Sequence, residues 1–282
     1  MWYSFLILHL VGLVGYNLVL RRSLSRRADP WVQAALMQTG IALPIIIVSW
    51  FVPLHLSAMT GEVGFLLCLA LSLTIALHIT NTLSLQRLEA GVHSVLYNVR
   101  LLFVTILGAI LLGEYVSFLQ IVGGGLIFMA AFIIRQRGSH KVTRAGVAWA
   151  VSCAMTIAYL NIVEKKLVTS VGYVTYMTLM AYIATPLLWS IVLVLKRPID
   201  RQLFCQKKTY LYLLMTFRAL SAHCFVLALS TGLVSITSFI SGTGVIIIMI
   251  LGALLLGERD HPRQKILATT LATLGLACIV WK

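Results

Sequence analysis

The sequence contains few charged residues, and acidic residues are the scarcest of them. Eight of the 282 residues are Asp or Glu, and charged residues make up 11% of the chain, whereas soluble globular proteins have about a quarter. No acid stands in the middle of an apolar run, since the aspartates lie between runs and the glutamates at run ends: Glu62, Glu89, Glu114, Glu164 and Glu258. The sequence therefore disfavours a cation or drug pump built on a buried carboxylate.

Cysteine is also scarce, and its spacing carries no motif. The chain has five cysteines, an odd number, and all but Cys205 lie inside apolar runs: Cys68, Cys153, Cys205, Cys224 and Cys278. We therefore predict no disulfide framework, no metal site and no cofactor. A basic leader with an Ala-x-Ala cleavage pattern is missing too, so the run over residues 2–20, which ends at Arg21-Arg22, is interpreted as a retained first span.

What the chain does contain is apolar sequence. Hydrophobic residues make up 60% of it and the mean hydropathy is +0.97, which is typical of a multi-pass membrane protein. We expect it to lie in the lipid bilayer of the plasma (inner) membrane. The formal charge of +14 does not indicate a nucleic-acid partner, because 20 of the 22 Lys and Arg residues lie between apolar runs or at the C-terminus.

Ten apolar runs are long enough to cross a bilayer as helices, which need about 20 residues. They cover residues 2–20, 32–52, 63–85, 92–112, 118–134, 145–163, 171–195, 210–231, 234–256 and 266–281. Some joints between runs are very short, so successive spans are expected to be antiparallel. The predicted fold is an all-α membrane protein with ten transmembrane helices.

One segment of the chain occurs twice. The sequence Ile-Leu-Gly-Ala-Ile-Leu-Leu-Gly-Glu at 106–114 returns as Ile-Leu-Gly-Ala-Leu-Leu-Leu-Gly-Glu at 250–258, an offset of 144 residues. The same offset relates four further sites: Asn17 to Asn161, Arg21-Arg22 to Lys165-Lys166, Ser94 to Ser238, and Gln120 to Gln264. We therefore expect two repeats, over residues 1–138 and 139–282. Five spans per repeat is an odd number, which makes the second repeat inverted in the membrane.

The distribution of basic residues predicts the orientation. Loops after the first, third, fifth, seventh and ninth runs carry 17 Lys and Arg, against three in the other loops and the termini. Because cytoplasmic loops are enriched in basic residues, both termini are predicted to lie outside the cytoplasm.

The two Leu-Gly-Glu signatures, each closing the fourth span of a five-span half, resemble those of EamA-type proteins of the drug/metabolite transporter superfamily. The resemblance covers the whole chain and implies a transporter, in a superfamily of amino-acid and metabolite exporters, nucleotide-sugar carriers and drug pumps. Glu114 and Glu258 match the signature glutamates, and we expect them to fix tight hairpins by accepting hydrogen bonds from the next helix. Members commonly carry a proline early in the fourth span, where this chain has Arg100-Leu101 and Gly244-Val245, and many have cytoplasmic termini.

Arg100 and Arg218 are the two basic residues inside apolar runs. Arg100 lies about 13 Å of helix past Gly91 and about 21 Å before Glu114. An uncompensated arginine at such a depth costs about 2.5–3.5 kcal/mol on insertion scales, so it is expected to face a wet cavity or an anion. The alternative is a structural arginine bonded to backbone carbonyls. Arg218 lies about equally deep in the eighth run.

Polar residues at helical spacing accompany the two arginines. His93, Tyr97 and Arg100 follow an i, i+4, i+7 pattern that puts them on one face of the fourth span. Thr74, His78 and Asn81 repeat this pattern in the third span. Both faces are predicted to line a polar cavity, although an intramembrane histidine is more often a packing residue than a proton carrier.

The repeat also pairs Asn98 and Arg100 with two glycines of the second half, Gly242 and Gly244. These glycines would either loosen the ninth span and expose backbone amides to a ligand, or allow close helix packing. We include Asn98, Gly242 and Gly244 among the candidate substrate-binding residues on the first alternative.

The function predicted from the sequence is a transporter, an exporter or exchanger, of a small polar metabolite such as an amino acid or organic anion. It would work by alternating access through a basic cavity between the repeats, as a monomer or homodimer without catalytic residues. One alternative is a membrane-embedded enzyme for lipid-linked substrates, for which His261 beside Asp260 is the candidate acid–base pair. Another is a non-transporting helper.

Overall fold

The computed structural model describes residues 2–23, 29–56, 59–112, 117–137, 143–199, 208–232, 234–256 and 262–280. Over these ranges the regular structure is helical and no strand occurs. The helices are α1 (Trp2–Ser23), α2 (Pro30–Ser49), α3 (Gly61–Arg87), α4 (Ala90–Tyr97), α5 (Arg100–Leu112), α6 (Phe118–Arg137), α7 (Arg144–Val171), α8 (Tyr173–Val194), α10 (Lys208–Thr231), α11 (Val234–Leu255) and α12 (Pro262–Val280).

Length and apolar composition allow seven segments of the described chain to cross a membrane, and Ile240–Leu255 and Ile266–Gly275 are shorter apolar helices. The prediction of an all-helical, multi-pass membrane protein is therefore confirmed. Glu114 and Glu258, with the hairpins expected beside them, lie outside the described residues.

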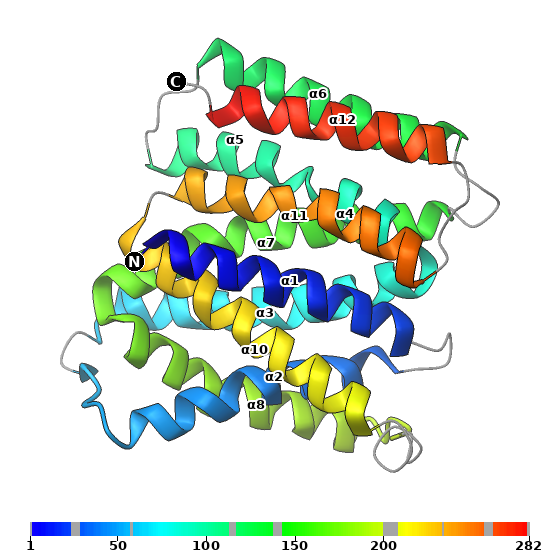
Figure 1. Ribbon diagram of the computed structural model, residues 1–282. Coiled ribbons are helices and arrows are strands. Elements are labelled where there is room, and N and C mark those ends of the chain that lie inside the picture. Colours follow the sequence, from blue (N-terminus) through cyan, green and yellow to red (C-terminus); the bar gives the residue numbers. More distant parts are fainter. Residues whose placement is uncertain are drawn as a thin grey trace.

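The most extensive helix contacts all join the two halves of the chain. They pair α1 with α10, α3 with α7, α2 with α8, and α6 with α12. In Figure 1, α6 and α12 lie side by side along one edge of the bundle, and α2 and α8 lie along the opposite edge. The other two pairs lie between these edges, together with α4 and α5, which both contact α11. Each helix of a pair thus buries its apolar face against a helix from the other half.

Two glycines allow the closest of these approaches. A Cβ atom on Gly12 of α1 would lie 2.5 Å from the backbone nitrogen of Ser221 in α10, and one on Gly275 of α12 would lie 2.5 Å from the carbonyl oxygen of Gly123 in α6. Any side chain at either position would push backbones apart, as at other small-residue helix crossings in membranes.

The fourth predicted span is interrupted, which the sequence did not predict. Helix α4 ends at Tyr97 and α5 begins at Arg100, with Asn98 and Val99 in a turn. Across this turn backbone amides bond to carbonyls three residues back, for example Val99 to Leu96 at 3.1 Å. The corresponding stretch of the second half stays helical within α11.

Gly244 lies within that uninterrupted helix. A Cβ there would meet the side chains of Leu13 and Leu10 at 3.2 and 3.3 Å. Of the two alternatives for this stretch, close packing is the one observed, since α1 lies against the glycine.

Helix α7 continues beyond its predicted end, and this corrects the position of one acid. The sixth run was expected to stop at residue 163, before Glu164-Lys165-Lys166, but α7 extends to Val171 and ends at Gly172, which has a φ of +82°. Glu and Lys are strong helix formers, so these residues continue the helix beyond the apolar run. Lys165 Nζ donates to the carbonyls of Leu229 (2.7 Å) and Gly232 (3.1 Å) at the end of α10. Glu164 is buried within the bundle.

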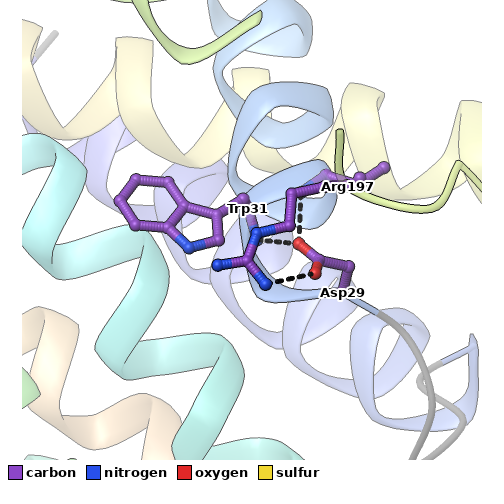
Figure 2. Close-up of polar contacts among 4 residues, drawn as sticks. Asp29, Trp31 and Arg197 are labelled. Carbon is purple, nitrogen blue, oxygen red and sulfur yellow. Dashed lines mark hydrogen bonds and ion pairs between the residues drawn. The ribbon is translucent and has the colours of Figure 1, made fainter. Parts of the chain in front are cut away.

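Asp29 joins the start of α2 to the segment just after α8 (Figure 2). Its Oδ1 accepts hydrogen bonds from the amides of Trp31 (2.8 Å) and Val32 (3.3 Å), which caps the N-terminus of α2. Its Oδ2 lies 3.7 Å from Nη1 of Arg197, just after α8. A single carboxylate thus caps one helix and holds the end of the other.

Candidate functional site

A central cavity lies between the helices and has about 850 Å³ of empty space, including its opening to solvent. Helices of both halves line it: α1, α2, α3, α4, α5, α7, α8, α10 and α11. Its polar lining residues are His9, Tyr16, Gln38, Thr74, His78, Asn81, Tyr97, Arg100, Glu164, Tyr176, Arg218, Ser221 and Ser241. A ligand in this cavity would touch both halves at once.

Arg100 starts α5 at the wall of this cavity. Its side chain is 2% exposed, and Nη2 donates to Ser241 Oγ at 2.7 Å and to the Ser238 carbonyl at 3.4 Å, both on α11. The guanidinium lies over the Tyr97 ring, 4.7 Å from its centroid. Its Nε has no hydrogen-bond partner in the described part of the chain. Arg100 therefore joins the two halves and retains an unused donor.

His9 of α1 fixes the serine that Arg100 binds. Its Nδ1 lies 2.9 Å from the Ser221 carbonyl, which can only accept, so Nδ1 carries a proton. Its Nε2 lies 2.7 Å from Ser241 Oγ. Since that oxygen already accepts from Arg100, its hydroxyl proton is free to be donated to Nε2. The chain Arg100–Ser241–His9–Ser221 is satisfied by a neutral His9 ring, which makes His9 a positioning residue.

Arg218 of α10 is held differently. Its guanidinium lies 5.1 Å from the centroid of the Tyr16 ring on α1. Its Nε is buried and has no hydrogen-bond partner among the described residues. Stacking on a ring leaves the in-plane donors of the guanidinium available for a planar anionic group.

Glu164 brings a carboxylate into the cavity. The sequence did not predict this, because no acid lies in the middle of an apolar run. Its side chain is 9% exposed, and Oε1 accepts a 3.0 Å hydrogen bond from the Tyr176 hydroxyl of α8. No ion pair joins Glu164 to Arg100 or Arg218. The cavity therefore holds one acid beside the two arginines, because α7 is longer than its apolar run.

The third helix supplies the predicted polar face. Thr74, His78 and Asn81 all line the cavity from α3. His78 Nε2 lies 3.2 Å from Gln38 Oε1 on α2. The α3 face therefore shares the cavity with Arg100 of its own half and Arg218 of the other half.

Five of the nine residues predicted to bind substrate line the cavity, and four lie beside it. His93 bonds to Ser84 Oγ at 2.8 Å and stacks on Tyr97, and Asn98 Nδ2 donates to the Gly242 carbonyl at 3.1 Å. His93 and Asn98 line a smaller neighbouring cavity of about 270 Å³. Gly242 and Gly244 serve contacts between helices, so these four residues shape the wall rather than face the main cavity.

The sequence reading missed several lining residues. His9, Leu13 and Tyr16 follow i, i+4, i+7 along α1, and Ile157, Leu160 and Glu164 follow i, i+3, i+7 along α7. The test that found the face of α3 looks for polar residues at helical spacing, and it did not single out either set because Leu13, Ile157 and Leu160 are apolar. The candidate enzyme pair, Asp260 and His261, lies outside the described residues. Within the part that is described, no three His, Cys, Asp or Glu side chains come together to hold a metal ion.

Comparisons with known proteins identify the chain's relatives. The model of the EamA-like transporter family matches residues 1–136 and again residues 144–281. Among 28 matching chains of solved structures, one described only as "Crystal structure of protein" superposes with a TM-score of 0.73 over 99% of this chain and 96% of its own. At 14% identity this likeness shows the fold alone. No curated protein matches.

Proposed function

Because the chain belongs to the EamA-like transporter family, we propose that it carries a small polar metabolite, such as an amino acid or organic anion, by alternating access through the central cavity. A transport function agrees with the multi-pass helical fold, and the family's members are transporters rather than enzymes. The expected place of work is the plasma membrane, as an exporter or exchanger.

The observation that carries this proposal is that both halves of the chain build the cavity. Arg100 of the first half binds Ser238 and Ser241 of the second, and Arg218 of the second half stacks on Tyr16 of the first. A ligand held by both arginines would be sensitive to any movement of one half against the other. Differential contacts of this kind are what couple a ligand to a conformational change.

The pattern of contacts supports an inverted repeat with ten spans, if α4 and α5 count as one. Exchanging the halves turns the α1–α10 pair into the α7–α3 pair, and leaves α2–α8 and α6–α12 as they are. One polar contact repeats as well. Arg21 donates to the Leu85 carbonyl at 2.8 Å, and Lys165 donates to the Leu229 carbonyl at 2.7 Å. Donors and acceptors are each 144 residues apart.

Transport by purified protein in proteoliposomes tests the proposal. Loading the vesicles with an unlabelled mixture of amino acids and organic anions, and following counterflow of each labelled compound, identifies what the protein carries. Arg100→Gln should abolish the flux while the protein still inserts and folds. Arg144→Gln is the matched control, because Arg144 is exposed at the start of α7. If wild-type vesicles exchange none of these compounds faster than empty vesicles, the transport proposal fails.

A further inference from the structure

The central cavity is lined by side chains of opposite charge that form no direct ion pair with each other. Glu164 is buried, and its carboxylate is bound by Tyr176 rather than by a cation. Arg100 and Arg218 each keep a buried Nε without a partner among the described residues. Burying charged groups without pairing them is costly. A ligand that pairs with the carboxylate and with the guanidinium groups would remove this cost.

The opposite charges lie at different levels of the cavity. Lys165, the neighbour of Glu164, reaches the carbonyls of Leu229 and Gly232 at the end of α10. Arg218 precedes Leu229 by 11 residues on the same helix, which is about 16 Å along its axis. The backbone of Glu164 therefore lies nearer to that end of α10 than Arg218 does, while both side chains line the cavity.

The wall between these two levels is mostly apolar. Lining side chains there include Ile157 and Leu160 of α7 and Ala222, Phe225 and Val226 of α10. Such a wall suits methylene groups or an aromatic ring rather than further polar groups. The cavity thus has an acidic end, an apolar middle and a basic part.

We propose that the cavity selects a dipolar ion whose ammonium group binds Glu164 and whose carboxylate or other acidic group binds Arg100 and Arg218, with an apolar segment between the charges. This inference rests on the proposed function and narrows its substrate class. The Tyr176 hydroxyl holds Oε1 of Glu164 and leaves Oε2 for the ammonium group. The unused donors of the two arginines receive the acidic group.

Other classes of ligand would leave charged side chains of the cavity unpaired, and this makes the cavity selective. An organic anion would fill the basic part and leave Glu164 uncompensated, and an amine would leave both arginines uncompensated. A compound with its charges on adjacent carbons would reach only one end. A site whose buried polar groups stay unpaired rejects a ligand strongly.

Thermal unfolding of the purified full-length protein measures this preference directly. The probes are 4-aminobutanoate, 5-aminopentanoate and 6-aminohexanoate, the carboxylates and amines of matching length, and glycine and alanine. Ligands that bind the folded state raise the unfolding temperature according to their affinity. At least one of the spaced dipolar ions should stabilise the protein more than its singly charged homologues and more than glycine or alanine. No such advantage for any of them overturns the proposal.

Two variants test which residue binds each charged group of the ligand. Glu164→Gln should remove the advantage of the dipolar ion over its carboxylate homologue, and Arg218→Gln should remove its advantage over the amine. Tyr176→Phe keeps the carboxylate and should weaken the preference without abolishing it. If Glu164→Gln keeps the preference and loses only the response of transport to a pH gradient, Glu164 is a proton carrier and the proposal is wrong.

Counterflow measurements distinguish the proposed selectivity from the proposed transport function on which it rests. If a dipolar ion binds with the expected preference but is never exchanged across proteoliposomes, the selectivity stands and the transport function fails. If anions are exchanged at a rate that Glu164→Gln does not change, and dipolar ions have no advantage, transport stands and the selectivity fails.

Discussion

Asn98 and Gly242, which are 144 residues apart and so occupy equivalent positions in the two halves, are hydrogen-bonded directly to each other. In the inverted repeat that we propose, equivalent positions can meet only near the two-fold axis that relates the halves. The bond is also asymmetric, because the chain turns at Asn98 but remains helical at Gly242.

Asn98→Ala should destabilise the protein by about 1 kcal/mol, because a buried hydrogen bond across the halves is lost. Thermal unfolding in detergent measures the change. Thr270→Ala is the control, since Thr270 is exposed and bonds only within its own helix, to the Ile266 carbonyl. Equal effects of the two substitutions would show that the Asn98 bond adds nothing.

Arg218→Gln should weaken transport without abolishing it, whereas Arg100→Gln should abolish it. Arg100 is fixed by hydrogen bonds to the other half, whereas stacking on Tyr16 is the contact that Arg218 makes among the described residues. Initial rates of counterflow over a range of substrate concentrations measure both variants. A normal rate for Arg218→Gln would remove this residue from the substrate site.

Ser241→Ala should lower substrate affinity, because Ser241 links Arg100 to His9. Ser221→Ala is its matched control. His9 still donates to the Ser221 backbone carbonyl when that hydroxyl is removed. We expect an apparent KM raised about tenfold for Ser241→Ala, which corresponds to about 1.4 kcal/mol of binding, and a near-normal value for Ser221→Ala. The reverse order would contradict the assignment of His9 as a positioning residue.

Asp29→Ala should destabilise the protein more than Arg197→Ala. Removing Asp29 deletes the N-cap of α2, which typically costs about 1 kcal/mol, as well as the ion pair. Arg197 is 41% exposed, and such ion pairs contribute about 0–1 kcal/mol. Chemical or thermal unfolding of both variants compares them. A larger loss for Arg197→Ala would mean that the ion pair, not the cap, holds this end.

Reporter fusions at both termini should show them outside the cytoplasm. The reason is the excess of 17 basic residues over three in alternate loops. A fluorescent protein that folds only in the cytoplasm should stay dark at the C-terminus, and an enzyme active only outside should work there. Cytoplasmic fluorescence would reverse the orientation and agree with the habit of many related proteins.

Local properties of the sequence were enough to predict the helices, and to predict that the two arginines line a cavity. Apolar runs predict spans, and the cost of burying an uncompensated arginine predicts that it faces a polar space. Arg100 and Arg218 do line the cavity, while their role in binding substrate stays a prediction.

Glu164 and the break at Asn98 could not be predicted in the same way, because each depends on a distant contact. The length of the apolar run did not show whether Glu164 would be buried, and Lys165 beside it bonds to carbonyls 64 and 67 residues away. The turn in the fourth span coincides with a bond from Asn98 to a carbonyl 144 residues away. Neither contact leaves a local pattern.

The pairing of helices across the halves has a consequence for synthesis in the cell. While the ribosome is still making the second half, α1, α2, α3 and α6 are already in the membrane without the helices that cover them. Until the second half arrives, the faces that will pack against it contact lipid, the insertion machinery or one another. A chain truncated after residue 137 would keep these faces uncovered, and would be expected to be degraded unless a separately made second half reaches it in time.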